Sequence, residues 1–401
     1  MELKKYKLGN IADIINGATP STQDIRNYDG NIIWITPKDL SDQKTKRIRR
    51  GQRNITIKGF NSCSAQMIPP HNILMSSRAP IGLLAINENE CCTNQGFKNL
   101  VINKSICDVD YIYYYLKFHI KEIESLGSGT TFKEVSKSSL YNFELSLPSI
   151  ENQRNISKCL SDLDQKIELN RQINDNLEAM AKQLYDYWFV QFDFPNEEGK
   201  PYKSSGGAMV WNENLKREIP QGWNDCKIKD FMRIFTGKKD VSKAVPGNYK
   251  FFSCAPEPIS SNEYIYDGYA VLVSGNGSYT GRVGFYKGKF DLYQRTYACV
   301  LDEDEHNISF FYYTLRYLFQ PIYSGGKHGS SIPYIVLGDL ADFRFAFNET
   351  ICTKFVDATK PMFDEQLLRQ KEIEVLTKQR DELLPLLMNG QATVNYHLSD
   401  D

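Results

Sequence analysis

The stretch that decides the fold reads KLGNIADIING at residues 7–17, and it returns as KIKDFMRIFTG at residues 227–237. The apolar positions and the closing glycine coincide in the two stretches, although most other residues differ. Self-similarity about 200 residues apart indicates a duplicated unit. The sequence therefore predicts two copies of one unit, and the segments after each opening stretch indicate the kind of fold.

The same features come after both openings in the same order. A short apolar run breaks into a Ser/Gly loop at residues 73–82 and again at residues 271–284, and a glycine-rich stretch comes later at residues 127–132 and 325–332. A run with period two, typical of a half-buried strand, is next in each copy. Its apolar positions are Leu140, Phe143, Leu145 and Leu147 in the first copy and Leu340, Phe343, Phe345 and Phe347 in the second.

We interpret the two copies as α+β domains in tandem, at residues 1–150 and 219–350, each followed by a long helix at residues 151–190 or 351–390. Apolar residues at three-four spacing give each helix a seam, which Asn170 and Asn174 interrupt in the first. We expect the helices to pair as an antiparallel coiled coil. The alternative is that each helix packs on its own domain. The seam residues are Ile156, Leu160, Leu163, Ile167, Leu177, Leu184, Phe363, Leu367, Ile373, Leu376 and Leu383.

Three smaller segments complete this organisation. The aromatic cluster at residues 185–195 is too dense for a flexible linker and should dock at the end of the first helix. Residues 191–218 are predicted as a connection, and residues 391–401 as a C-terminal tail. Pro385 is expected to kink the second helix or to end its seam.

Composition and overall charge exclude some classes of function. The chain has 401 residues, of which 41% are hydrophobic, and its 48 Lys and Arg balance 49 Asp and Glu. Overall charge therefore cannot steer the protein to a polyanion, so any such site must be local. The nine cysteines follow no metal-binding spacing and suit reduced, mostly buried thiols, and the absence of a signal sequence predicts a cytoplasmic protein.

The sequence contains no convincing catalytic constellation. Gly275, Gly277 and Gly281 lack the spacing of a dinucleotide fingerprint, and no phosphate-binding loop of the Gly-x-x-x-x-Gly-Lys type occurs. The five histidines accompany no nucleophile motif or carboxylate pair. Two repeats without such a set favour binding over catalysis, and no metal site is predicted.

Local positive charge supplies a candidate site for a polyanion. Residues 44–53 carry six cations and no acid, which is enough to neutralise several phosphates. The alternative is a solvated basic loop. Tyr279, Tyr293 and Tyr297 are interpreted as packing residues. The candidate DNA-binding residues are Lys44, Lys46, Arg47, Arg49, Arg50, Arg53, Arg78, Lys98, Lys238, Lys239, Lys243, Arg282, Arg295, Lys327 and His328.

In the order and duplication of its motifs, the whole chain resembles the specificity subunit of type I restriction-modification systems. Besides the opening stretches, the similar segments are Trp34–Leu40, Ser76–Gly82, Thr93–Phe97, Gly127–Phe132, Leu145–Pro148 with Glu151–Gln153, Tyr187–Val190 and Glu218–Trp223. The resemblance implies two target-recognition domains, each reading one half of a split double-stranded DNA site. It also implies two conserved spacer helices that hold the domains apart and dock the methyltransferase subunits, two of which are expected.

The resemblance assigns the chemistry to partner subunits. S-adenosylmethionine would serve adenine methylation by the methyltransferase, and ATP and Mg²⁺ would serve the restriction and translocation subunits. No cofactor or catalytic residue is expected in this chain. Two departures from the family pattern are Gly275–Gly277 in place of Ser77–Ala79, and Ile351–Thr353 in place of a Glu-x-Gln lead-in. The two domains should therefore read different sequences. Competing interpretations are a DNA methyltransferase or nuclease with an unrecognised catalytic site, and a duplicated scaffold without a nucleic-acid role.

Overall fold

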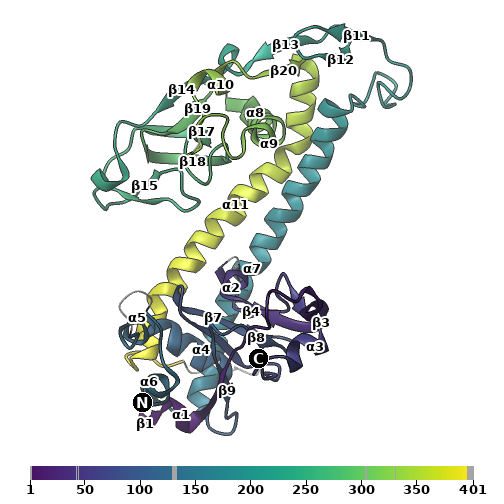
Figure 1. Ribbon diagram of the computed structural model, residues 1–401. Coiled ribbons are helices and arrows are strands. Elements are labelled where there is room, and N and C mark those ends of the chain that lie inside the picture. The colour runs from purple at the N-terminus through teal and green to yellow at the C-terminus, as the bar shows by residue number, and fades with distance from the viewer. Residues whose placement is uncertain are drawn as a thin grey trace. The chain divides into compact units, whose positions relative to one another are not determined.

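A computed structural model describes residues 2–41, 43, 45–128, 133–302, 305–329 and 331–394. It divides into two compact units (Figure 1). The first unit comprises Met1–Gln172 with Gln370–Asp401, and the second comprises Ile173–Arg369. Each unit therefore holds one predicted domain together with a part of both long helices.

The first unit is built on a five-stranded sheet, a three-stranded sheet and a two-stranded ribbon. The five-stranded sheet has the order β2 (Ala12–Asn16), β9 (Lys98–Ile102), β6 (Ile73–Ser77), β7 (Ile81–Asn87) and β4 (Arg47–Ile48). The smaller sheet has the order β5 (Asn54–Ile55), β3 (Tyr28–Ile35) and β8 (Cys92–Thr93), and β1 (Lys4–Lys7) pairs with β10 (Glu144–Leu147). The helices are α1 (Leu8–Ile11), η1 (Ile25–Asn27), α2 (Pro37–Ser41), α3 (Ile57–Asn61), α4 (Val109–Phe118), α5 (Ile120–Ser125) and α6 (Lys137–Tyr141).

The second unit repeats this plan with a six-stranded sheet. Its order is β14 (Arg233–Thr236), β19 (Thr296–Val300), β17 (Tyr266–Ser274), β18 (Val283–Leu292), β15 (Tyr249–Phe252) and β16 (Ile259–Ser261). The ribbons are β13 (Asn224–Lys227) with β20 (Arg344–Phe347), and β11 (Met209–Asn212) with β12 (Arg217–Pro220). The short helices are η3 (Ile228–Asp230), η4 (Val241–Lys243), η5 (Glu305–Asn307), α8 (Ile308–Thr314), η6 (Leu315–Phe319), α9 (Gln320–Tyr323) and α10 (Leu337–Ala341).

The duplication extends to the hydrogen-bond register. The backbone N–H of Leu8 donates to the carbonyl of Phe143 at 2.8 Å, and that of Ile228 donates to the carbonyl of Phe343 at 3.2 Å. The order β2-β9-β6-β7 in one sheet corresponds to β14-β19-β17-β18 in the other. A parallel strand, β4 or β15, lies next at the same place. The predicted tandem α+β domains are confirmed.

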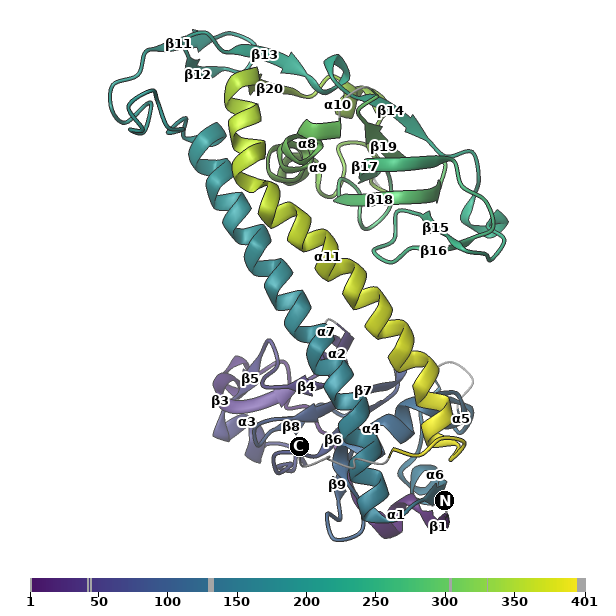
Figure 2. The same ribbon diagram turned by 180° about the vertical axis from the view of Figure 1, so that it is seen from behind.

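The two long helices are α7 (Ile150–Tyr185), continued by the π-helical turn η2 (Asp186–Val190), and α11 (Glu349–Met388). They lie side by side and run in opposite directions (Figures 1 and 2), since Asp164, Asn170 and Asn174 on α7 contact Arg380, Glu372 and Gln366 on α11. Both begin one or two residues before their predicted starts. The side-chain amide of Asn170 donates to Glu372 on the other helix at 3.0 Å, which accounts for a polar residue in the apolar seam. Asn174 contacts the other helix through its backbone carbonyl, which accepts from the side-chain amide of Gln366 at 3.3 Å.

The seam is divided among three apolar clusters. Ile156 and Leu160 join the core of the first domain, where Leu387, Met388 and Leu383 from α11 also pack. Ile167, Ile373 and Leu376, with Leu163 beside them, form a small cluster between the helices. Phe363 belongs to the core of the second domain, against which Leu184 and Leu367 pack, whereas Leu177 is only half-buried. Neither helix therefore packs only on the domain that precedes it.

The proline expected to disturb the second helix does not end it. α11 continues through Pro385 to Met388, and Leu387 and Met388 beyond the proline are buried. The N–H of Asn389 donates to the carbonyl of Pro385 at 3.0 Å. Of the two predicted alternatives, an end of the seam at Pro385 is wrong, because the apolar core of the first domain covers the last turn. A kink at Pro385 stays a prediction.

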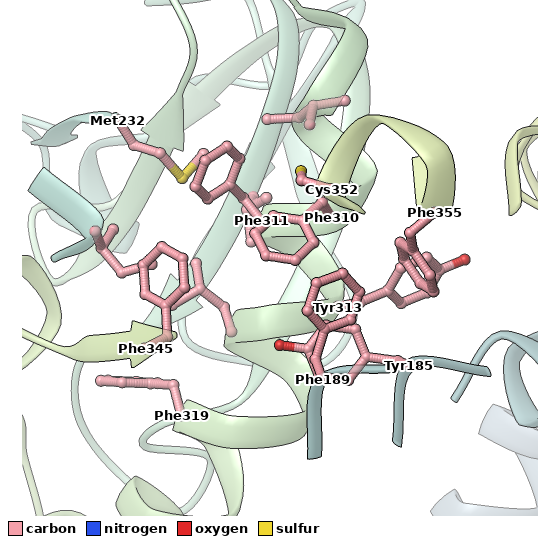
Figure 3. Packing of buried hydrophobic residues seen from close by; sticks show 14 of the residues in the cluster. Tyr185, Phe189, Met232, Phe310, Phe311, Tyr313, Phe319, Phe345, Cys352 and Phe355 are labelled. Atoms are coloured by element: carbon pink, nitrogen blue, oxygen red, sulfur yellow. The ribbon is translucent and has the colours of Figure 1, made fainter. Parts of the chain in front are cut away.

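The aromatic segment after α7 packs in the core of the second domain. Phe189 lies 5.1 Å from Tyr185, 4.9 Å from Phe310 and 5.1 Å from Phe355, measured between ring centroids (Figure 3). The hydroxyl of Tyr185 donates to Thr314 at 2.9 Å. The segment thus forms part of the second domain, rather than docking only at the end of the first helix.

The segment predicted as a connection, residues 191–218, is more ordered than that description implies. Phe192 and Phe194 are buried, and Asp193 accepts hydrogen bonds from the N–H and hydroxyl of Ser204 at 2.7 and 2.6 Å. β11 and the first half of β12 lie within it. Burial of the aromatic rings explains why the segment folds.

Two further observations concern the cysteines and the possibility of a membrane-spanning helix. All nine cysteines are free, and five of them are buried. Burial raises the pKa of the Cys107 thiol to about 12. Within the ranges that the structure describes, no helix is long and apolar enough to span a membrane.

Candidate nucleic-acid interface

Loops of the first domain gather at the end of the central sheet where β6 turns into β7. The N–H of Val135 donates to the carbonyl of Ser77 at 3.0 Å, and the N–H of Ser77 donates to that of Gly96 at 2.7 Å. The N–H of Ala18 donates to the carbonyl of Thr93 at 2.9 Å. We call residues 17–19, 77–80, 93–98 and 133–135 the first loop cluster.

The second domain assembles the corresponding loops in the same way. The N–H of Ile335 donates to the carbonyl of Gly275 at 2.9 Å, and the N–H of Gly275 donates to that of Arg295 at 2.9 Å. The N–H of Gly237 donates to the carbonyl of Tyr293 at 3.3 Å. We call residues 237–239, 275–282, 293–297, 327–329 and 331–335 the second loop cluster.

Backbone register makes Gly275 the equivalent of Ser77, so that Asn276 stands in the position of Arg78. Lys98 pairs with Asn16 in the first sheet, and Tyr297 pairs with Thr236 in the second. The isolated bridge between Ser128 and Glu134 corresponds to the one between His328 and Tyr334. The two clusters thus share one backbone frame and differ in the side chains that it carries. At equivalent backbone positions, the first cluster has Arg78, Lys98 and Glu134, and the second has Asn276, Tyr297 and Tyr334.

Charged side chains in the first loop cluster converge on Glu134. Its carboxylate lies 3.0 Å from the ammonium of Lys98, 3.6 Å from the guanidinium of Arg78, and 3.2 Å from the hydroxyl of Ser77. Burial raises the pKa of Glu134, but the hydrogen bonds from Lys98 and Ser77 and the positive charges of Lys98 and Arg78 together outweigh that effect and hold the pKa below its ordinary value. Lys98 is 10% exposed and Arg78 is 38% exposed. Arg78 therefore faces solvent, whereas Lys98 lies inside.

The second loop cluster presents aromatic and polar groups instead. The hydroxyl of Tyr297 donates to the carbonyl of Ile335 at 3.3 Å, and the ring of Tyr334 stacks on His328 at 5.3 Å. His328 also lies 3.1 Å from Asp339. Tyr279, interpreted from the sequence as a packing residue, is 48% exposed. The surface of this cluster is therefore partly aromatic.

Cations of the second domain differ in their availability. Lys238, Lys243 and Arg295 are exposed, and the ammonium of Lys327 lies 4.2 Å from the ring centroid of Tyr323. Arg282 donates to the carbonyls of Ala255 and Pro256 at 2.6 and 3.2 Å, and Lys239 pairs with Glu263 and Asp291. Fixed internal partners make Arg282 and Lys239 weaker candidates for DNA contacts than the exposed residues.

The basic run of the first domain is largely neutralised within the protein. Lys46 lies 2.7 Å from Asp110, contacts Tyr114 and Ser161, and is only 8% exposed, while Arg47 donates two hydrogen bonds to Asp110. A buried cation cannot contact DNA without leaving its acid, so Lys46 is a weak candidate for DNA binding. Because Lys46 is buried, the alternative of a solvated basic loop does not apply to it either. Lys98, which is 10% exposed and lies 3.0 Å from Glu134, is a weaker candidate for a DNA contact for the same reason.

The rest of this run reaches the surface. Arg49 pairs with Glu88 at 2.5 Å but stays 81% exposed, and Arg50 is exposed. The guanidinium of Arg53 lies 3.9 Å from the ring centroid of Tyr28 and 3.4 Å from Asp29. Lys44 lies outside the described residues, as do residues 129–132 of the glycine-rich stretch.

A polar cavity beside the first loop cluster was not predicted. It is widely open to solvent, has a volume of about 850 Å³, and is lined largely by hydroxyl and amide side chains, among which Thr19 is hydrogen-bonded to Gln95. The lining includes Ser21, Thr22 and Gln23. Gln95 was not a candidate residue, although it lies within the family-like segment Thr93–Phe97. Glu134 was also missed, although it follows the glycine-rich stretch by two residues.

No metal-binding constellation occurs among the residues that the structure describes, since no three His, Cys, Asp or Glu side chains converge there. His119 contacts Tyr115 through tilted rings whose centroids lie 4.4 Å apart. The geometry of the loop clusters, with exposed cations, amides and aromatic rings on a repeated frame, is suited to recognition of a polyanion with local differences in readout.

Comparisons with known proteins agree with this geometry. The family model described as "Type I restriction modification DNA specificity domain" matches residues 1–179 and 220–347. The MjaIX specificity subunit of a type I restriction enzyme from Methanocaldococcus jannaschii is 32% identical over 98% of this chain and 94% of its own length. The EcoDI specificity subunit from Escherichia coli is 32% identical over 44% of this chain and 40% of its own.

A crystal structure of the S subunit of a type I restriction-modification system from M. genitalium shares the fold, with a TM-score of 0.60, 16% identity and 96% coverage of both chains. The duplicated domain with two long helices is thus the fold of a DNA-specificity protein. The chain belongs to the family of type I restriction-modification DNA specificity subunits.

Proposed function

We propose that this chain selects a split double-stranded DNA site for a type I restriction-modification complex, with each domain reading one half. The observation that carries this proposal is the shared backbone frame of the two loop clusters, on which Arg78, Lys98 and Glu134 are replaced by Asn276, Tyr297 and Tyr334. The same frame supports the same approach to DNA, and different side chains support different half-sites.

The proposed domain limits are those predicted from the sequence, with recognition domains at residues 1–150 and 219–350. The exposed residues Arg49, Arg50, Arg53, Arg78, Lys238, Lys243, Arg295, Lys327 and His328 are proposed to contact DNA. Lys239 and Arg282 are weaker candidates for DNA contacts, because each already binds a group within the protein. Phosphate contacts would supply affinity, and contacts to base edges would supply specificity.

The helices are proposed to dock the methyltransferase subunits, two in number. Large apolar side chains outside the seam support this role, because Leu169, Met180, Leu368 and Val375 are each about half exposed or more. Exposed apolar groups of this kind favour a protein partner. S-adenosylmethionine would bind to those partners, ATP and Mg²⁺ to the restriction subunits, and the complex would act in the cytoplasm.

Reconstitution tests the proposal against the enzyme alternative, which the family match does not favour. The chain is combined with the methyltransferase subunits of its own system, and methylated adenines are mapped in DNA. We expect methylation at one split site that requires both components and S-adenosylmethionine. Methylation or cleavage by the pure chain, or methylation by the mixture without any split site, would contradict the proposal.

A further inference from the structure

Glu134 is the centre of a three-residue arrangement in the first loop cluster. Lys98, which is 10% exposed, and the hydroxyl of Ser77 hold one carboxylate oxygen, at 3.0 and 3.2 Å. The other oxygen faces the guanidinium of Arg78 at 3.6 Å. Lys98 and Ser77 belong to β9 and β6, two hydrogen-bonded neighbours in the central sheet, so the carboxylate is held by a rigid support.

Arg78 stands differently from the other two residues. It lies at the turn between β6 and β7, keeps 38% of its side chain exposed, and donates no side-chain hydrogen bond to any residue in the described ranges. A guanidinium has five N–H donors in a fixed fork. An ion pair at 3.6 Å restrains the position of the fork while leaving its donors available to a ligand.

The arrangement is confined to one of the two domains. Asn276, Tyr297 and Tyr334 occupy the equivalent positions in the second domain, and none of the three carries a charge at neutral pH. The shared frame therefore folds without the ion pairs. Because the fold does not require these ion pairs, their presence in the first domain points to a role in recognition.

We propose that Arg78 reads a guanine edge in the half-site of the first domain, and that Glu134, anchored by Lys98, is the positioning residue that aims it. The inference rests on the proposed function. Arginine donates two parallel hydrogen bonds to O6 and N7 of guanine in the major groove, a geometry that requires an oriented fork. Glu134 also repels phosphate, so it disfavours backbone contacts by Arg78 and leaves the base contact favoured.

The test uses the full chain in complex with its methyltransferase subunits and a DNA library in which each half-site position is varied. Methylation rates give the discrimination at every position. We expect R78A to reduce discrimination about tenfold or more at one G·C pair of one half-site. E134Q and K98M should weaken discrimination at that same pair, and E134Q should increase binding to unrelated DNA because a negative charge is removed.

Two further variants separate orientation from charge and from folding. R78K keeps the charge without the fork, so it should lose discrimination as R78A does, while the salt dependence of binding stays that of the wild type. D342N is the matched control, since Asp342 in the second domain also pairs with two cations, Lys227 and Lys229, each at 2.8 Å. It should leave both half-sites unchanged, and thermal melting should show that every variant is folded.

Two results would overturn the inference. If R78A weakened binding to all sequences equally and reduced the salt slope by about 0.9, Arg78 would be a phosphate contact. If E134Q left discrimination at the pair read by Arg78 unchanged, Glu134 would not position it. Failure of the proposed function is distinguishable from both, because the wild-type complex would then show no split site at all.

Discussion

Arg380, near the end of α11, donates from Nη1 to the carboxylate of Asp164 on α7 at 2.9 Å, and both side chains are only 17% exposed. Asp164 also accepts a hydrogen bond from the hydroxyl of Tyr114 on α4 at 2.5 Å. Burial and the charge of Asp164 raise the pKa of that hydroxyl above its usual value. The pair therefore joins both long helices to the core of the first domain.

Replacing Arg380 with methionine should lower the free energy of unfolding of the first unit by about 2 to 3 kcal/mol, because Asp164 would remain largely buried without its cation. Urea unfolding measures the change. K378M is the control, since the exposed pair of Lys378 and Glu382 at 3.8 Å should contribute about 0.5 kcal/mol or less. Equal effects of the two substitutions would contradict the structural role of Arg380.

The pKa of Glu134 is predicted to lie below the ordinary carboxyl value in the wild type and to rise in K98M. Burial then acts against one cation, Arg78, instead of two. NMR titration of the Glu134 side chain measures both values. A carboxyl whose pKa is depressed on folding stabilises the protein above its unfolded pKa and loses that contribution as pH falls through the folded pKa. An identical pKa in K98M would show that Lys98 does not hold the carboxylate.

The basic run should separate into surface and interior residues. Replacing Arg49 and Arg50 with glutamine is expected to reduce the slope of log binding constant against log salt concentration by about 1.8, or about 0.9 for each lost phosphate contact. K46M should leave the slope unchanged and destabilise the fold, because Asp110 loses a buried partner. A slope that falls in K46M and not in the double variant would reverse this assignment.

Lengthening the helices tests the spacer role that the family resemblance implies for them, in which the helices hold the recognition domains apart. One heptad is inserted after Gln172 in α7 and another after Arg369 in α11, which preserves the contacts of Ile167 with Ile373 and of Asn170 with Glu372. A heptad adds about 10 Å, or about three base-pair steps, so the unspecified spacer of the methylated site should lengthen or methylation should stop. An insertion in α7 alone is the control that breaks the pairing. Efficient methylation at the original spacing by the doubly lengthened chain would exclude a spacer role.

Apolar periodicity in the sequence was sufficient to predict the repeated frame. Leu145 and Phe345 occupy equivalent positions in β10 and β20, and both pair with the ribbon strand that opens their domain. Such positions are predictable because the period of a strand is local in the sequence. The division of the helix seam among three clusters was not predictable, because Leu387 packs with residues more than 200 positions earlier in the chain.

The candidate site was predictable only in its exposed part. A run of cations indicates local positive charge, but the acid that neutralises Lys46 and Arg47 is Asp110, which lies on α4 and more than 60 residues away in the chain. Glu134 was missed for the same reason, since its partners Lys98 and Arg78 approach it only in the folded domain. Residue type indicates which charges exist, whereas the fold determines which of them remain free.

The central claim is that each domain reads its own half-site, and exchanging one domain tests it most directly. Residues 1–150 are replaced by the first recognition domain of another family member, the complex is reconstituted with the same methyltransferase subunits, and methylated adenines are mapped by sequencing. We predict that one half of the split site changes while the other half and the spacer stay as in the wild type. A change in both halves, or in neither, would contradict independent reading by the two domains.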